Sequence, residues 1–124
     1  MRDLTASQRK IIGSERHIWP YGLAFAEAIY ADRLELIQQD MLARALSVVI
    51  LFDTENMYWL TGYQTFGYFS FQAMCIPASG KPVIVTRVVN RDMALALPTI
   101  GNAIAVFDTQ DHVDILEAYL KDTV

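Results

Sequence analysis

The sequence predicts a single α/β domain, a three-layer-like arrangement in which a mixed, mainly central β-sheet is flanked by helices. The chain of 124 residues fits one domain and is long enough to bury a core without a disulfide. Stretches with helical periodicity alternate with short β-branched runs. Two of these runs, joined by a tight turn, form a hairpin, so part of the sheet must be antiparallel.

The first change of pattern lies near residue 23. Residues 1–22 show no sustained period and end at Pro20 and Gly22, so we interpret them as an irregular leader and assign residues 23–124 to the domain. From residue 23 to 46, apolar side chains recur at steps of three and four, which predicts an amphipathic helix with an inner face of Tyr30, Leu34, Ile37, Met41 and Ala45.

A continuous apolar run follows this helix. "SVVILFD", residues 47–53, is typical of a strand covered on both faces, and we expect it at the centre of the sheet. Asp53 or Thr54 can cap a short helix over residues 55–60, because each offers an oxygen to the free amides of a first turn. Gly62 is a natural stop for that helix.

The remaining elements are predicted in the same way. Residues 68–78 and 82–89 form the two strands of the hairpin, with Pro77 and Pro82 near its turn. A helix over 90–97, a strand over 102–108 and a helix over 109–123 complete the domain. We expect Asp108 or Thr109 to cap the last helix.

Composition bounds the partners. An apolar fraction of 53% with 19% charged residues exceeds the usual apolar share, so part of the surface should be covered by a partner. The net charge of −4 and the lack of a basic run argue against nucleic acid. "ALSVVILF" is too short to cross a bilayer, and no secretion signal is visible, so we expect no membrane contact and a cytoplasmic location. The single Cys75 fits a reducing compartment.

The residues alone show no catalytic constellation and no metal site. His17 and His112 are the only histidines, and early-turn acids beside His112 already favour the helix dipole. Cys75 lies in an apolar strand, which predicts an inert buried thiol. Arg87 and Arg91 could hold a carboxylate, although a solvated or ion-paired role is the expected one. No glycine pattern has the spacing of a phosphate-binding loop.

Residues 30 to about 91 resemble the amino-terminal domain of the creatinase, prolidase and aminopeptidase P family. "YADRLELIQQDMLARAL" is similar to the family's first helix, and "FQAMCIPASGKPVIVTRVVNR" to its hairpin. Between them, "VVILFDTENMYWLTGY" is similar to a strand followed by an Asn-x-x-Tyr-x-(Thr/Ser)-Gly motif. The matching residues, expected to be structural, are Arg33, Asn56, Tyr58, Thr61 and Gly62.

The resemblance implies a two-domain subunit whose first domain is non-catalytic. A following pita-bread domain, which this chain lacks, would carry the catalytic groups and a divalent metal (Mn, Co or Zn). No cofactor is expected on this chain, and the fragment itself is expected to be inactive. Its implied partners are its own carboxyl-terminal catalytic domain and further copies of the subunit, as a homo-oligomer such as a dimer.

The resemblance also implies that this domain lends side chains to an active-site mouth. The stretch "GYQTFGYFSFQ" carries more aromatics than one strand face needs, so the candidates for a substrate entrance are Tyr63, Phe66, Tyr68 and Gln72. The alternative, that these side chains form sheet face and core, stays open, since aromatics favour strands. Tyr58 and Leu60 should pack inward, with Asn56 and Thr61 bonding the backbone at the helix ends.

Several parent proteins are compatible with this resemblance. Creatinases hold a substrate carboxylate with a basic residue in the hairpin region, whereas residues 64–80 contain no Arg or Lys, so creatinase activity is disfavoured. An Xaa-Pro dipeptidase or aminopeptidase is preferred, and an ectoine-hydrolase-like amidohydrolase stays open. A different class also remains, a free-standing α/β binding or interaction domain that shares the fold.

Overall fold

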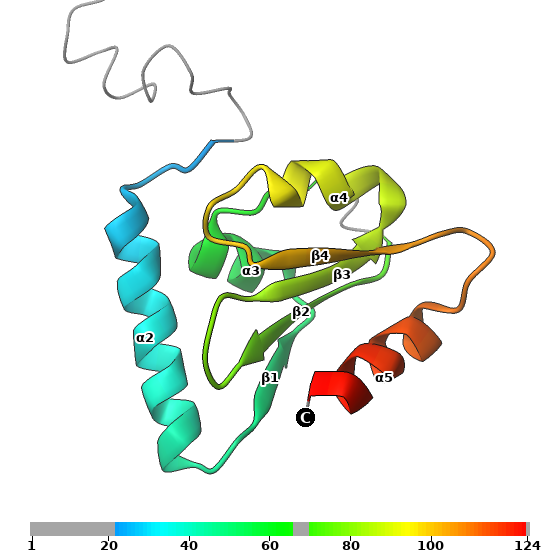
Figure 1. Cartoon of the computed structure of the whole chain (residues 1–124). Helices are drawn as coiled ribbons and strands as arrows, with labels where there is room; N and C mark the ends of the chain where they lie inside the picture. The colour runs from blue at the N-terminus through cyan, green and yellow to red at the C-terminus, as the bar shows by residue number, and fades with distance from the viewer. Residues whose placement is uncertain (1–21, 66–69, 124) are drawn as a thin grey trace, which may run out of the picture.

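A computed structural model describes residues 22–65 and 70–123. The elements, in chain order, are α2 (Glu27–Ala43), β1 (Val48–Leu51), α3 (Thr54–Thr61), β2 (Gln72–Pro77), β3 (Val83–Arg87), α4 (Val88–Leu95), β4 (Asn102–Val106) and α5 (His112–Thr123). This order of helices and strands is the predicted one (Figure 1). Of the predicted leader, only Gly22 belongs to the described residues.

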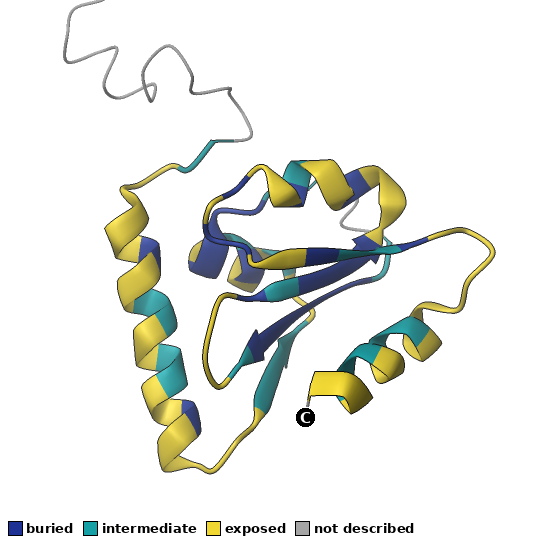
Figure 2. Cartoon of the chain, viewed as in Figure 1, coloured by how far each residue is buried: buried dark blue, intermediate teal, exposed yellow. Residues whose placement is uncertain are grey.

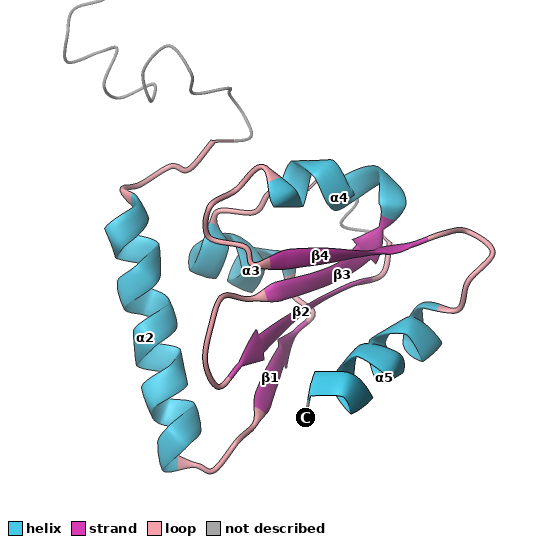
Figure 3. Ribbon diagram, viewed as in Figure 1, coloured by secondary structure: helices cyan, strands magenta, loops and turns pink. Residues whose placement is uncertain are grey.

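The four strands form one mixed sheet in the order β1-β2-β3-β4. β1 pairs antiparallel with β2, β2 pairs antiparallel with β3, and β3 pairs parallel with β4. The antiparallel pair β2 and β3 is the predicted hairpin, while α4 is the crossover that a parallel pair requires (Figure 3). The mixed α/β class is therefore confirmed.

Each face of the sheet has its own apolar core, because successive side chains of a strand point to opposite faces. The larger core joins Met74 of β2 and Ile84 of β3 to side chains of α2, α3 and α4, among them Met41, Met57 and Ala94. The smaller core lies on the other face, beneath α5. It consists of Ala73, Val85 and Val106, with Ile50, Phe71, Ile104, Ile115 and Leu116 around them. The helix α5 has no fully buried residue, so this side is more thinly covered (Figure 2).

The expected central position of the first strand is wrong. Within residues 22–65 and 70–123, β1 lies at an edge of the sheet and pairs with β2 alone. Its four residues are all half-buried, because Val49 and Leu51 face one core while Ile50 faces the other. A continuous apolar run therefore indicates that both faces of a strand are covered, here by helices. It does not indicate whether the strand has a neighbour on one side or on both.

Three element ends also differ from the prediction. α2 ends at Ala43, and Ala45 lies beyond it with a left-handed φ of 55°. β3 ends at Arg87, so Val88 and Val89 open α4 instead of extending the strand. Asp111, not Asp108 or Thr109, caps α5 by accepting from the amides of Val113 and Asp114.

Candidate functional site

A chain of buried polar side chains lies in the larger core, at the end of the sheet where β2 begins. The Tyr63 hydroxyl donates to Gln72 Oε1 at 2.5 Å, and the Thr86 hydroxyl donates to the same oxygen at 3.1 Å. Asn90 Nδ2 donates to Thr86 Oγ1 at 3.2 Å. The Thr65 hydroxyl lies 3.4 Å from Asn90 Oδ1, which extends the chain to the partly buried end of the loop. We call these five residues the polar network.

The backbone brings these residues together. Gln72 and Thr86 are register partners across β2 and β3, so their side chains stand on the same face. Asn90 follows Thr86 by four residues, and the chain turns from β3 directly into α4 between them. Tyr63 comes just after Gly62, which ends α3 in the left-handed conformation and turns the chain towards the core. Buried polar groups are costly unless they are bonded, and this network bonds them.

Burial sets the electrostatics of the network. It raises the pKa of Tyr63 above its ordinary value of 10.0, and the neighbouring hydroxyls of Thr65 and Thr86 oppose that rise. The phenol is therefore a neutral hydrogen-bond donor at neutral pH. It positions the loop after α3 and is unsuited to proton transfer near pH 7.

An open depression of about 370 Å³ lies beside the network. Its lining consists of Thr54, Glu55, Tyr58, Tyr63, Gln64 and Thr65. Hydroxyls, one amide and the Glu55 carboxylate can hydrogen-bond a polar or cationic group there. Among the described residues of the lining, no nucleophile is paired with a base, and the groups present are ones that recognise a ligand by hydrogen bonds.

The predicted entrance residues are only partly brought together. Tyr63 and Gln72 are bonded to each other and are 1% and 3% exposed, respectively. Tyr63 lines the depression, whereas Gln72 does not belong to its lining. Phe66 and Tyr68 lie outside the described residues. The entrance role of these four residues stays a prediction. Because Tyr63 and Gln72 are buried, their side chains stabilise the structure of this domain beside the depression.

Thr86 and Asn90 belong to the same network and were not predicted. Their signal in the sequence is weak. Thr86 is a polar residue that ends an apolar run, and Asn90 stands four positions later. Only the β2 and β3 register reveals that Thr86 faces Gln72.

The Asn-to-Gly motif shapes α3. Asp53 caps this helix by accepting from the Glu55 amide at 2.9 Å, as expected, while Asn56 lies exposed on its surface. The Thr61 hydroxyl donates to Met57 O at 2.8 Å and accepts from the Tyr63 amide, so it satisfies backbone groups at the helix end. Leu60 is buried and Tyr58 is half-buried.

Arg33 joins α2 to α3. Its Nη1 donates to Trp59 O at 2.6 Å, and its guanidinium lies 4.6 Å from the centre of the Trp59 ring. The rings of Phe25 and Tyr30 lie 5.7 and 5.6 Å from the same group, which gives three cation–π contacts. Trp59 is 47% exposed, so the aromatic stretch around α3 contributes to the surface as well as to the core.

The described residues do not fit a metal. Within residues 22–65 and 70–123, no three His, Cys, Asp or Glu side chains gather closely enough to hold an ion. His112 is exposed and stacks on Phe71 at 4.2 Å. Arg87 pairs with Asp108 at 3.0 Å, as expected for an ion-paired role. Cys75 is fully buried, as predicted, and burial raises the pKa of its thiol to about 11, which disfavours the reactive thiolate.

No helix within residues 22–65 and 70–123 combines the length and the apolar character needed to cross a bilayer.

Known proteins share both the sequence and the fold. The model of the Creatinase/Prolidase N-terminal domain matches residues 33–124. The ectoine hydrolase of Halomonas elongata is 33% identical over 73 residues, which cover 59% of this chain and 18% of that protein. The chain thus matches less than a fifth of this curated relative.

Solved structures agree on the fold. The prolidase of Thermococcus sibiricus superimposes with a TM-score of 0.68 at 17% identity, covering 77% of this chain and 26% of that one. The N-terminal domain of the Xaa-Pro dipeptidase from Lactobacillus brevis gives 0.65 at 18% identity, covering 73% of this chain and 67% of that one. Because the family model covers most of the chain, from the middle of α2 to its end, the chain belongs to the Creatinase/Prolidase N-terminal domain family.

Proposed function

We propose that this chain is the non-catalytic amino-terminal domain of a metal-dependent hydrolase of the Xaa-Pro dipeptidase or aminopeptidase type. In this proposal it contributes to oligomerisation and shapes the approach to an active site on a partner domain. Membership of the family and the similarity to dipeptidase structures support the parent class. A cytoplasmic location is part of the same proposal.

The observation that carries the entrance role is the polar network. It fixes both ends of the loop between α3 and β2, through Tyr63 and Thr65 on one side and Gln72 on the other. The bonded side chains at these two ends are thereby held in position, which is what a positioning surface requires. The depression beside it offers hydrogen-bonding groups without a nucleophile.

The assembly role is supported by an apolar surface on α2 and α3. Phe25, Ile29, Leu36 and Trp59 are 52%, 39%, 64% and 47% exposed. Arg33 contacts the rings of Phe25 and Trp59, and Ile29 and Leu36 lie one helical turn to either side of it. Aromatic residues and arginine are enriched in protein interfaces. We call these five residues the α2–α3 surface and assign it to contact with a second copy of the subunit.

The metal of the parent hydrolase is assigned to the catalytic domain. The described residues of this chain do not bring together three ligands, so none of them is given a role in holding Mn, Co or Zn. In this proposal the chain orients the substrate and excludes poorly fitting molecules, through the depression and the loop beside it.

A second substrate class is favoured by one observation. The ectoine hydrolase of Halomonas elongata is 33% identical over its matched segment, while the dipeptidase structures compared above are 17% and 18% identical. Sequence identity therefore favours an ectoine-hydrolase-like parent, whereas the number of similar folds favours a dipeptidase. The two proposals share the non-catalytic role of this domain.

The test is a turnover assay with the chain as it stands. Purified chain, supplied with Mn²⁺, is incubated with an Xaa-Pro dipeptide and separately with ectoine, and the products are followed by chromatography. We expect no release of proline and no opening of ectoine. Turnover of either substrate that survives repurification would contradict the non-catalytic role. The same two substrates, given to a longer protein that carries this domain, distinguish the two parent classes.

A further inference from the structure

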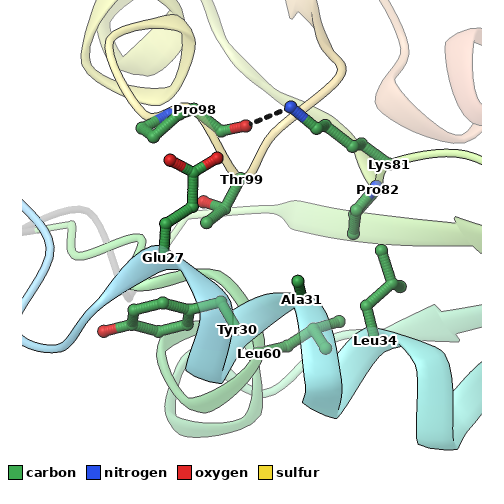
Figure 4. A pocket seen from close by; sticks show the side chains of 9 residues that line it. All are labelled: Glu27, Tyr30, Ala31, Leu34, Leu60, Lys81, Pro82, Pro98 and Thr99. Atoms are coloured by element: carbon green, nitrogen blue, oxygen red, sulfur yellow. Dashed lines mark hydrogen bonds between the residues drawn. The ribbon is translucent and has the colours of Figure 1, made fainter.

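Two pockets lie away from the depression described above. The first lies between α2 and the loop that precedes β4, and Figure 4 shows its lining. Its volume of about 70 Å³ corresponds to little more than two water molecules at about 30 Å³ each. The lining is mainly apolar, and its Lys81 ammonium already donates to Pro98 O at 2.6 Å. This pocket therefore offers a ligand little space and few polar partners.

The second pocket lies at the end of the sheet where β3 and β4 finish, on the face that α5 covers. Its volume of about 240 Å³ is that of about eight water molecules in the liquid. Aromatic rings and charged side chains share its lining. We call it the β4–α5 pocket, and the side chains that matter here are Phe71, Arg87, Phe107, Asp108, Gln110 and His112.

The sheet itself places a guanidinium beside an aromatic ring in this pocket. Gln72 of β2 and Thr86 of β3 are register partners, and both side chains belong to the polar network. Phe71 precedes the first of them and Arg87 follows the second, so these two stand opposite each other on the other face of the sheet. Arg87 is also the register partner of Val106, a buried member of the smaller core.

The loop from β4 to α5 forms the remaining wall and is held by several contacts. The Phe107 amide donates to Gln110 Oε1 at 3.0 Å, and the Gln110 amide donates to Phe107 O at 2.9 Å. His112 stacks on Phe71, with ring centres 4.2 Å apart and 20° between the ring planes. These contacts shape the pocket before a ligand arrives, which lowers the entropy cost of binding.

Arg87 keeps hydrogen-bond donors for a ligand. A guanidinium has five N–H groups and can hold a carboxylate through two parallel bonds. Here Nη2 donates to Asp108 Oδ1 at 3.0 Å, and within residues 22–65 and 70–123 no second acceptor is bonded to the guanidinium. Asp108 is 80% exposed and Arg87 only 44%, so the arginine lies deeper than its partner. The Gln110 side chain, whose oxygen accepts from Phe107, adds an amino group as a donor.

We propose that the β4–α5 pocket binds a small planar carboxylate, such as an aromatic or heterocyclic acid. Its carboxylate accepts from Arg87, and its ring lies against Phe71 and Phe107, because aromatic faces favour planar partners. Asp108 competes with this ligand for the same guanidinium. The pocket borders the smaller core, whereas the depression borders the larger one, so the binding does not depend on the proposed hydrolase role.

A nuclear magnetic resonance titration of the complete ¹⁵N-labelled chain tests the proposal. The probe is benzoate, and benzamide is a control of nearly the same shape without the charge. Ionic strength is kept constant with chloride, because exposed charges are screened by salt. We expect benzoate to shift the amides of residues 106–112 with a saturable, millimolar Kd. Benzamide should bind at least tenfold more weakly.

Three variants separate a binding role of Arg87 from a structural one. Arg87→Gln should weaken benzoate binding at least tenfold, since it removes the charged donor. Asp108→Asn should tighten it at least threefold, because it removes the competing carboxylate. Arg91→Gln makes the same change of charge on α4, outside the lining, and should leave the Kd unchanged. A purely structural ion pair would instead make Arg87→Gln and Asp108→Asn change in the same direction.

The proposal is overturned by shifts that do not saturate, by equal affinity for benzoate and benzamide, or by weaker binding in Asp108→Asn. Equal losses in Arg87→Gln and Arg91→Gln would also overturn it, because they would reduce the effect to net charge. The ¹⁵N spectrum of each variant verifies that the domain is folded. Arg87→Lys, which keeps the charge but not the planar fork, is a milder second variant. It should bind benzoate more weakly than the wild type, and an unchanged Kd would contradict the role of Arg87.

Discussion

Gly62 occupies a backbone conformation that other residues adopt at a cost. Its φ is 78°, and a Cβ there would meet Leu23 Cδ2 at 2.8 Å and the Tyr30 hydroxyl at 3.3 Å. The left-handed conformation alone costs about 1–2 kcal/mol for a residue with a Cβ. The motif glycine is thus required both by the turn that ends α3 and by the close packing around it.

Gly62→Ala should lower the free energy of unfolding by about 2–4 kcal/mol, the sum of left-handed strain and overpacking. Urea unfolding followed by circular dichroism measures this. Gly80→Ala is the matched control, because Gly80 has a φ of 93° with nothing within 4 Å of the added Cβ. It should cost only the strain, about 1–2 kcal/mol. Equal losses in both variants would show that contacts with Leu23 and Tyr30 do not matter.

The Cys75 thiol predicts a pH dependence. Its pKa is raised from 9.0 to about 11 by burial, so at pH 8 its thiolate fraction is about a hundredfold below that of an unfolded chain. A thiol reagent should therefore react with the native protein at least a hundredfold more slowly than in urea. Reaction at the same rate in both states would contradict the burial of Cys75.

The sign of the stability effect follows from the same shift. The unfolded thiol ionises near pH 9 while the folded one stays protonated, so the stability contributed by this group is complete below pH 9 and is lost as pH rises towards 11. The raised pKa of Tyr63 acts in the same direction above pH 10. Cys75→Ala should reduce the loss between pH 9 and 11, which unfolding curves at several pH values can test.

At the scale of elements, Arg33 is the main polar link between α2 and α3. Its bond to Trp59 O and its position against three rings use the planar guanidinium, which lysine cannot reproduce. Arg33→Ala should lower the free energy of unfolding by about 1–2 kcal/mol, and Arg33→Lys should recover less than half of that. Urea unfolding followed by circular dichroism measures both variants.

Arg44 offers a control within the same helix. It pairs with Asp40, but both side chains are largely exposed, at 68% and 62%. Such a pair contributes little, so Arg44→Ala should change stability by less than about 0.5 kcal/mol. If Arg33→Ala and Arg44→Ala had the same small effect, the contact between Arg33 and Trp59 would not hold the two helices together.

The order of elements could be predicted from the sequence because helical and strand periods alternate clearly along it. The position of β1 could not, since its apolar run reflects the helices on both faces, whereas among the described strands β1 is the first of the sheet. The end of α2 could not be predicted from the sequence either. Ala45 keeps the helical spacing of apolar residues, yet the Leu46 amide bonds back to Met41 O and the chain turns there.

The candidate site was predictable only in part. Aromatic density drew attention to Tyr63, and the start of a strand to Gln72, but the sequence does not show that they bond to each other. Thr86 and Asn90 depend on the register of β2 with β3 and on the abrupt change from β3 into α4. Side chains that are polar and buried are set by tertiary contacts, which local patterns do not contain.

At the scale of the whole molecule, the apolar excess of the composition is located on the α2–α3 surface and on scattered positions elsewhere. Leu36 is 64% exposed within that surface, and Leu42 is 82% exposed on another face of the same helix. The two leucines are separated by about 600° of helical rotation, which is one full turn and a further 240° or so. A contiguous apolar surface with aromatic residues and an arginine is typical of an interface, whereas single exposed leucines are not.

The most direct test of the assembly role is the mass of the chain in solution, measured by light scattering during size-exclusion chromatography. The chain has a mass of 14.0 kDa, and we predict a dimer of about twice that value. Leu36→Glu should convert it to a monomer, while Leu42→Glu should not. A wild-type chain that remains at 14.0 kDa at the highest soluble concentration would contradict an assembly role carried by this domain.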